Sequence, residues 1–278
     1  MLKGLRDRLL RRKGPVVPVI RMSGAIGAVP GRRGGIDMQT LAGPIEAAFS
    51  NRRAKAVALS INSPGGSPVQ SSLIASRIRR LAAEKELPVI AFVEDIAASG
   101  GYWLALAADE IFVDASSIVG SIGVISAGFG FTEAIARLGI ERRAHTTGPA
   151  KGMFDPFRPE SEADVRILKE LQGDIFAAFR NHVSERRGPA IRAGDEELFS
   201  GRVWSGSRAV ELGLADAIGD LHGEMRRRFG EHVRLVALNP RRSWLQRRLG
   251  IGEDREGDLA RSLVATIEER LLYNRFGL

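Results

Sequence analysis

Cysteine is absent from this 278-residue chain, which therefore forms no disulfide and offers no thiolate metal site or cysteine nucleophile. Aromatic residues make up only 6% of the chain, and there are four histidines. No apolar run approaches the roughly 20 residues that a membrane-spanning helix needs, and charged residues stand where a signal peptide carries its hydrophobic segment. With 44% hydrophobic residues, the chain can still bury a sizeable core. We expect a cytoplasmic globular protein that holds no metal or cofactor.

Lysine is also scarce, because only six of the 41 basic residues are lysines and the rest are arginines. Basic residues gather within residues 3–13 and again within residues 226–248, and the formal net charge is +8. Such clusters can hold a protein at an anionic lipid surface, but they show no regular interleaving of aromatic residues that would stack on bases. The sequence favours a solvated surface, leaves open a peripheral contact with the inner face of the membrane, and predicts no nucleic-acid partner.

Short β-branched runs alternate with helical patterns along most of the chain. Strands are predicted at residues 16–20, 54–61, 88–93, 111–113, 142–146 and 233–238. Helices are predicted after the cap residue Asp37, over residues 68–85, and over residues 161–187. The last helix is expected to bury a stripe formed by Val165, Leu168, Leu171, Ile175 and Phe179. This alternation predicts an α/β fold with a mostly parallel sheet and crossover helices.

Shifts in composition divide the chain into three segments. Residues 1–14 form a basic stub, residues 15–239 form the α/β domain, and residues 240–278 form a charged linker followed by an amphipathic helix. This last helix is indicated by apolar residues at every fourth position, Leu259, Leu263, Ile267 and Leu271. Packing against protein is the favoured interpretation of its apolar face, and a membrane contact is the alternative.

Two glycine-rich turns each follow a predicted strand, Asn62-Ser-Pro-Gly-Gly-Ser67 and Ala98-Ser-Gly-Gly101. Ligands of open α/β sheets bind at the carboxyl ends of strands, so the two turns can line one crevice. Glycine lets the backbone approach a substrate, and free N–H groups can stabilise a developing negative charge. Ser99 is therefore a candidate nucleophile. The alternative is that both turns serve only to reverse the chain.

A serine hydroxyl needs a base before it becomes a good nucleophile. The histidines are His145, His182, His222 and His232, and solvated positions are expected for the last three. His145 is a candidate because it ends a predicted strand. Lys151 competes with it, because it stands among small and apolar residues in Thr147-Gly-Pro-Ala-Lys-Gly-Met-Phe-Asp-Pro-Phe157, and burial favours a neutral amine.

Five stretches follow one another in a recognisable order. They are Ser63-Pro-Gly-Gly66, Ala97-Ala-Ser-Gly-Gly-Tyr-Trp-Leu-Ala-Leu-Ala-Ala-Asp109, Val119-Gly-Ser-Ile-Gly-Val-Ile125, Ala150-Lys-Gly-Met-Phe-Asp-Pro-Phe157 and Gly201-Arg-Val-Trp-Ser-Gly-Ser-Arg-Ala-Val-Glu-Leu-Gly-Leu-Ala-Asp216. Together they resemble the motifs of the signal peptide peptidase A family, the SppA/SohB-like serine peptidases, over about residues 17–221. The resemblance implies a ClpP/crotonase fold, a layered α/β spiral that assembles into homo-oligomeric rings.

The resemblance also implies a role for each matching residue. Ser99 matches the nucleophile, Lys151 the general base, and Ser121 the serine that orients this lysine. The backbone N–H groups of Gly66 and Gly100 match the oxyanion hole. The implied reaction hydrolyses unstructured peptides, such as signal-peptide remnants, through an acyl-enzyme. In the rings of this family, the serine and lysine of one site can come from neighbouring chains.

Other residues are expected to support this site. Gly65, Tyr102 and Phe154 are expected to bind substrate, and core packing is the alternative for the two aromatic side chains. Asp155-Pro156 is interpreted as a turn that fixes the lysine loop. The stretch from Gly201 to Asp216 is interpreted as a helix with a serine cap and a glycine stop.

Three rival classes remain open. A ClpP-type protease uses a histidine after the nucleophile helix, where this chain has Ser121-Ile-Gly-Val124. A crotonase-like acyl-CoA hydratase or isomerase shares the oxyanion turns but requires no nucleophilic serine. A non-catalytic, membrane-associated scaffold of the same fold is the third, and only an assay separates it from an enzyme.

Overall fold

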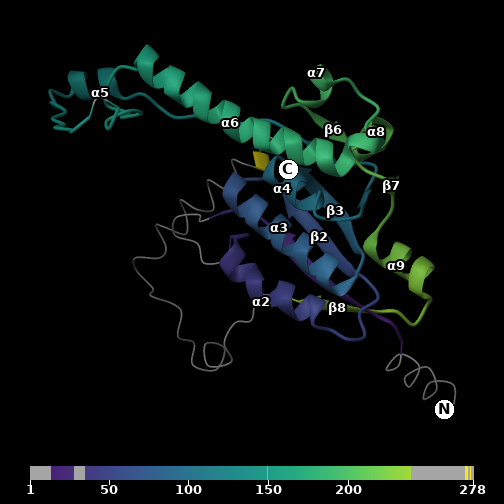
Figure 1. The fold of residues 1–278 in the computed structure, drawn as a ribbon. Coiled ribbons are helices and arrows are strands. Elements are labelled where there is room, and N and C mark those ends of the chain that lie inside the picture. Colours follow the sequence, from purple (N-terminus) through teal and green to yellow (C-terminus); the bar gives the residue numbers. More distant parts are fainter. Residues whose placement is uncertain (1–13, 28–34, 149, 239–272, 275, 277–278) are drawn as a thin grey trace, which may run out of the picture. The chain divides into compact units, whose positions relative to one another are not determined.

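The structure is a computed structural model that describes residues 14–27, 35–148, 150–238, 273, 274 and 276 (Figure 1). Its contacts divide the chain into two compact units. We call Met1–Ile122 together with His182–Leu278 the sheet unit, and Gly123–Asn181 the arm. The predicted basic stub, apart from Gly14, and the predicted helix at residues 259–271 lie outside the described residues.

One mostly parallel sheet forms the centre of the sheet unit. In the described part of the chain it has eight strands, which are β1 (Val16–Ser23), β2 (Val57–Ser63), β3 (Val89–Ala98), β4 (Glu110–Val113), β5 (Ile118–Gly120), β6 (Val203–Ser205), β7 (Ala217–Ile218) and β8 (Arg234–Leu238). Their order is β6-β5-β3-β2-β1-β8, and β4 pairs with β3 and β7. The pairing of β5 with β6 is antiparallel. The predicted α/β fold with a mostly parallel sheet is confirmed.

Helices of the sheet unit begin at capping residues that the sequence carries. The Asp37 carboxylate accepts a hydrogen bond from the Thr40 N–H at the start of α2 (Met38–Phe49), and Ser67 caps α3 (Pro68–Lys85). Figure 1 shows α2 and α3 side by side over one face of the sheet. The other helices of this unit are α4 (Gly100–Ala105), η1 (Gly188–Ala190), α7 (Asp195–Leu198), α8 (Gly206–Leu212) and α9 (Leu221–Phe229).

The central strands β1, β2 and β3 are buried along nearly their whole length, as expected when both faces of a parallel sheet are covered. Ile45 of α2 and Ile74 of α3 are fully buried. Met225 of α9 is buried in a separate cluster with Val17, Ala58, Phe92 and other strand residues. The core therefore holds the strands rigidly and fixes where they end.

The arm contains α5 (Thr132–Arg137) and most of α6 (Glu162–Arg187). Residues 142–146, predicted as a strand, have no regular structure, so that prediction is wrong. The predicted buried stripe of α6 is only partly confirmed, because Phe179 is buried and Leu171 is 51% exposed. The other three residues, Val165, Leu168 and Ile175, are half-buried. This face of α6 is therefore partly covered.

Candidate active site

Three parallel strands of the sheet unit end side by side. β2 ends at Ser63, β3 at Ala98 and β5 at Gly120. The register pairs Ser63 with Ala97, and Ala98 with Gly120. The turns that follow therefore meet at one edge of the sheet, where α/β sheets bind their ligands.

Ser99 lies at the end of β3 and immediately before α4, in a backbone conformation that non-glycine residues rarely adopt. Its φ is 52° and its ψ is −120°. The Ser99 N–H donates to the Gly120 carbonyl oxygen at 2.8 Å, and the Ser99 carbonyl oxygen accepts from the Trp103 N–H at 3.0 Å. A residue in such a conformation costs free energy and persists only where its surroundings fix it, which is common at active sites. The turn therefore holds Ser99 in one defined position.

The glycines after β2 are required by the close approach of this turn to its neighbours. A Cβ atom on Gly65 would lie 2.8 Å from the Ser99 Cβ, and one on Gly66 would lie 2.1 Å from the Ile26 carbonyl oxygen. Both glycines have positive φ, 108° and 141°. The buried Ser63 hydroxyl holds the turn, since it donates to the Gly24 carbonyl oxygen and accepts from the Gly65 N–H.

Among the described residues, the N–H groups of Gly66 and Gly100 have no acceptor, and neither has that of Gly101 in the first turn of α4. The turns are adjacent, because a Cβ on Gly100 would lie 3.4 Å from the Gly66 nitrogen. Gly100 is buried and Gly66 is exposed, so this pair of N–H groups can be reached from solvent and is suited to binding an anionic oxygen. The predicted oxyanion-hole residues therefore lie together beside Ser99.

Ser121 follows Gly120, the residue whose carbonyl oxygen accepts from Ser99. Ser121 also has a positive φ, 52°, and its N–H donates to the Arg202 carbonyl oxygen at 2.7 Å. The structure thus brings Ser121 to the strand end next to that of Ser99.

Lys151, Phe154 and His145 belong to the arm, so the structure describes them on a different unit from Ser99. All three side chains are exposed there. Asp155 forms the predicted turn, because its carboxylate accepts from the Phe157 N–H at 3.1 Å. The same carboxylate forms an ion pair with Arg142.

Tyr102 is not a substrate-binding residue, and that prediction is wrong. Its side chain is fully buried, and its hydroxyl donates to the Leu214 carbonyl oxygen at 2.9 Å. Burial raises the pKa of Tyr102 well above its ordinary value. Trp103 is buried as well. Both aromatic side chains therefore pack in the core.

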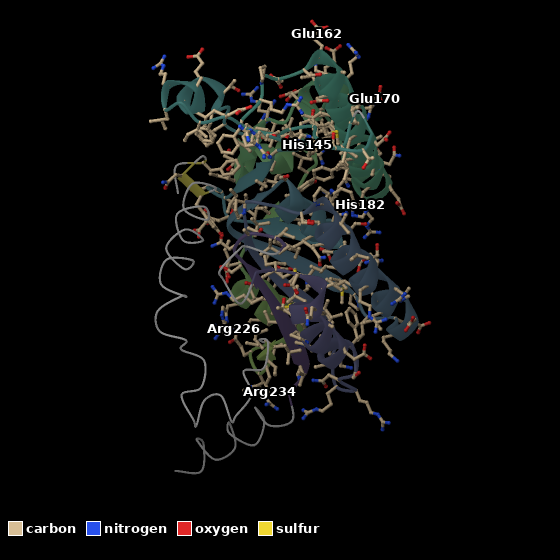
Figure 2. The ribbon with its side chains drawn as sticks, turned by 90° about the vertical axis from the view of Figure 1, so that its left-hand side faces the viewer. His145, Glu162, Glu170, His182, Arg226 and Arg234 are labelled. Atoms are coloured by element: carbon tan, nitrogen blue, oxygen red, sulfur yellow. The ribbon has the colours of Figure 1, made fainter. Side chains whose placement is uncertain are left out.

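His182 is half-buried rather than solvated, which corrects a second prediction (Figure 2). Its ring stacks on Trp103 with centroids 5.3 Å apart, and burial lowers the pKa of His182. Nearby, the Arg186 guanidinium donates to the carbonyl oxygens of Leu106 and Ala108 just beyond α4. The end of α6 therefore holds the helix that follows Ser99. No local pattern predicts these contacts, because the partners lie about 80 positions apart.

The stretch from Gly201 to Asp216 is structural, as predicted. Ser205 caps α8 through the Arg208 N–H, and Gly213 ends this helix in a left-handed conformation. Asp216 accepts from the guanidinium of the buried Arg187 at 2.9 Å and from the Ile111 N–H at 2.7 Å. The described residues include no cluster of His, Asp and Glu that could hold a metal ion. Within the same part of the chain, no helix has both the length and the hydropathy for a membrane span.

Comparisons with known proteins show what the chain is similar to. It aligns along its whole length with the Na(+)/H(+) antiporter NhaA of Brucella melitensis at 46% identity, and covers 39% of that protein. It is 32% identical to a putative signal peptide peptidase SppA of Enterococcus faecium, over 61% of this chain and 48% of that protein. The chain thus spans less than half the length of these curated relatives.

A solved structure, a mutant of the 1510-N membrane-bound stomatin-specific protease, shares the fold. The TM-score is 0.52 at 16% identity, over 82% of this chain and 99% of that chain. The model of peptidase family S49 matches residues 82–229, a segment that contains Ser99, Ser121 and Lys151. This match covers more than half of the sequence, and the chain therefore belongs to peptidase family S49.

Proposed function

We propose that this chain is a serine peptidase that hydrolyses unstructured peptides with Ser99 as nucleophile and Lys151 as general base. The observation that carries the proposal is the arrangement at the sheet edge. Ser99 stands in a fixed, strained conformation beside two backbone N–H groups that lack acceptors in the described structure, those of Gly66 and Gly100. Membership of family S49 supports the same reaction class.

In the proposed reaction, the neutral Lys151 amine removes the proton from the Ser99 hydroxyl as its oxygen attacks the peptide carbonyl carbon. The Gly66 and Gly100 N–H groups donate to the resulting oxyanion, and Ser121 orients the lysine. The tetrahedral intermediate then expels the amine, which takes the proton from Lys151. Water attacks the acyl-enzyme by the same route and releases the acid. Gly65 and Phe154 contact the substrate.

The active form is a homo-oligomer in this proposal. Lys151 is exposed in the single chain, whereas desolvation is what favours a neutral lysine amine. A second copy packed against the arm would cover this lysine and the exposed apolar side chains around it. Ser99 and Lys151 of one site then come either from one chain or from two neighbours.

The names of the relatives guide the choice of substrate. The Enterococcus faecium relative is named for signal peptides, so remnants of cleaved signal peptides are the proposed physiological substrates. The antiporter name belongs to a protein of which this chain covers 39%. We propose no ion transport for the chain, because the arrangement at its sheet edge is suited to acyl transfer.

The test is labelling of Ser99 with a fluorophosphonate, combined with hydrolysis of an unstructured peptide. Ser99→Ala should abolish both, and Lys151→Ala should lower both by about 10³-fold or more, while circular dichroism shows that each variant is folded. His145→Ala is the matched control and should keep full activity. Loss of activity in His145→Ala with retention in Lys151→Ala would disprove the dyad. Turnover of an acyl-CoA by Ser99→Ala would instead support the hydratase class.

A further inference from the structure

Gly120 connects the two serines of the candidate site. Its carbonyl oxygen accepts the Ser99 N–H at 2.8 Å, and Ser121 follows it in the chain. The Ser121 N–H donates in turn to the Arg202 carbonyl oxygen at 2.7 Å. Arg202 immediately precedes β6, the antiparallel neighbour of β5. The position of Gly120 therefore affects where both serines lie.

The indole ring of Trp204 in β6 lies directly against Gly120. A Cβ atom on Gly120 would lie 2.6 Å from both Cε3 and Cζ3 of this ring, and 2.9 Å from the Arg202 carbonyl oxygen. Gly120 also has a positive φ of 116°, which side chains other than glycine rarely allow. The ring and the Arg202 carbonyl group therefore leave room only for glycine at this position.

Trp204 is held in place by its surroundings. It is 5% exposed, and its register partner Val119 in β5 is fully buried. A buried indole N–H usually has a hydrogen-bond acceptor, but the Nε1 atom of Trp204 is buried with no partner among the residues that the structure describes. Within this part of the chain, packing rather than a hydrogen bond from Nε1 holds the ring. The shape of the side chain is therefore what matters to Gly120.

We propose that Trp204 is a positioning residue of the site. Its ring limits the position of Gly120, which in turn limits Ser99 through the hydrogen bond and Ser121 through the peptide bond. A displacement of about 1 Å in an active site can lower the rate by about 10²-fold. The inference rests on the proposed function, in which Ser99 attacks the peptide and Ser121 orients Lys151.

Trp204 differs in this respect from the rest of the stretch between Gly201 and Asp216. The caps of α8 and the ion pair of Asp216 stabilise the fold. The contact of Trp204 reaches the carboxyl end of β5, next to the turn that holds Ser99. Loss of the indole ring should therefore slow the chemical step in addition to lowering stability.

The test compares peptide hydrolysis by Trp204→Ala and Trp204→Phe, per folded molecule. Trp204→Ala should lower kcat by about 10²-fold. Its KM should stay close to that of wild type, because the residues proposed to contact the substrate are unchanged. Trp204→Phe keeps an aromatic ring beside Gly120 and should retain most of the kcat. Circular dichroism gives the folded fraction of each variant.

Phe49→Ala is the matched control. Phe49 is 3% exposed and is the last residue of α2. The segment that follows it reaches the start of β1, where Ala54 forms a bridge with Val16. Phe49 therefore lies away from the carboxyl ends of the strands. Its replacement removes a buried aromatic ring and should destabilise the fold, but should leave the kcat per folded molecule unchanged.

A second measurement does not depend on peptidase activity. The Ser99 N–H donates to Gly120, so hydrogen exchange of this amide reports whether Gly120 keeps its place. Exchange should be faster in Trp204→Ala than in wild type, Trp204→Phe or Phe49→Ala. If Ser99→Ala still hydrolyses peptide, the proposed function fails, and hydrogen exchange alone then decides the role of Trp204.

Three results would overturn the inference about Trp204. The first is full kcat in Trp204→Ala while Ser99→Ala is inactive. The second is an equal loss of kcat in Phe49→Ala, which would show that lost stability alone explains the effect. The third is unchanged hydrogen exchange of the Ser99 amide in Trp204→Ala.

Discussion

In the sheet unit, long apolar side chains such as Ile20, Met22 and Ile78 are fully buried, whereas in the arm Phe129, Leu138 and Ile125 are 82%, 73% and 64% exposed. The named apolar side chains are thus buried in the sheet unit and exposed in the arm. Soluble proteins rarely leave large apolar patches uncovered, and such patches commonly mark interaction sites. The described part of the sheet unit exposes a few such side chains, among them Val69 and Leu73. The exposed apolar side chains of the arm are those that the proposed second copy would cover.

The same contrast holds for charges. Arg187 of the sheet unit has a side chain that is 7% exposed and pairs with Asp216, whereas Arg137 of the arm is 82% exposed and pairs with Glu133. A buried charge that loses its partner is costly, and an exposed pair contributes little. Substitutions in the two units should therefore differ in effect even when the chemical change is identical.

The largest effect on folding is expected for Arg187→Met. This change removes the donors to the Gly213 carbonyl oxygen and the Asp216 carboxylate, and should lower the free energy of unfolding of the sheet unit by about 3 kcal/mol. The matched variant in the arm, Arg137→Met, should change it by less than about 0.5 kcal/mol. Urea unfolding followed by tryptophan fluorescence measures both. Equal effects would show that the exposure of an ion pair does not determine how much it contributes to the free energy of unfolding.

Glycine substitutions in the two units should differ in their effect on peptide hydrolysis. Gly66→Ala forces a Cβ against the Ile26 carbonyl oxygen and displaces a proposed oxyanion donor, so peptide hydrolysis should fall by about 10² to 10³-fold. Gly128→Ala in the arm meets no atom within 4 Å and should leave the rate unchanged. The rates are compared per folded molecule, and circular dichroism gives the folded fraction of each variant. Full activity in Gly66→Ala would remove Gly66 from the proposed site.

The sequence predicted the sheet unit better than the arm, and the reason is physical. Strand and helix patterns arise where one chain buries its own apolar face, as in β1 and α3. In the arm, the apolar stripe of α6 has the same periodicity, but its residues are buried to different degrees, from the buried Phe179 to Leu171, which is 51% exposed. Periodicity predicts that a face is apolar and does not identify what covers it.

Within the candidate site, prediction succeeded for the positions that local backbone features determine. Gly65, Gly66 and Ser99 could be placed from the sequence, because turn residues and strand ends are local features. Tyr102 could not, because its position follows from the direction in which α4 leaves the strand and from the distant Leu214 carbonyl oxygen. Long-range partners of this kind leave no local pattern.

The stability of the sheet unit should depend on pH through the Glu224 carboxylate of α9. Hydrogen bonds from Arg227 and the cost of burial act in opposite directions on Glu224 of α9, and the net result lowers its pKa to about 2 from an ordinary value of 4.5. A lowered pKa means that the carboxylate stabilises the fold fully above pH 4.5 and that this contribution is lost as the pH falls towards 2. Glu224→Gln should therefore flatten the acid dependence of unfolding in that window. A mutant curve parallel to that of wild type down to pH 2 would contradict the assignment.

The smallest effect on the fold, and the most direct test of the arm, is expected from replacing its exposed apolar side chains. The double substitution Phe129→Ser and Leu138→Ser removes no buried contact. The free energy of unfolding of the isolated chain should therefore change by less than about 0.5 kcal/mol. If the arm packs against a second copy, the same variant should shift the protein from oligomer to monomer in analytical ultracentrifugation. Peptide hydrolysis should fall in proportion, because the proposed site needs the second copy to cover Lys151. An oligomer that survives the double substitution would show that another surface holds the copies together.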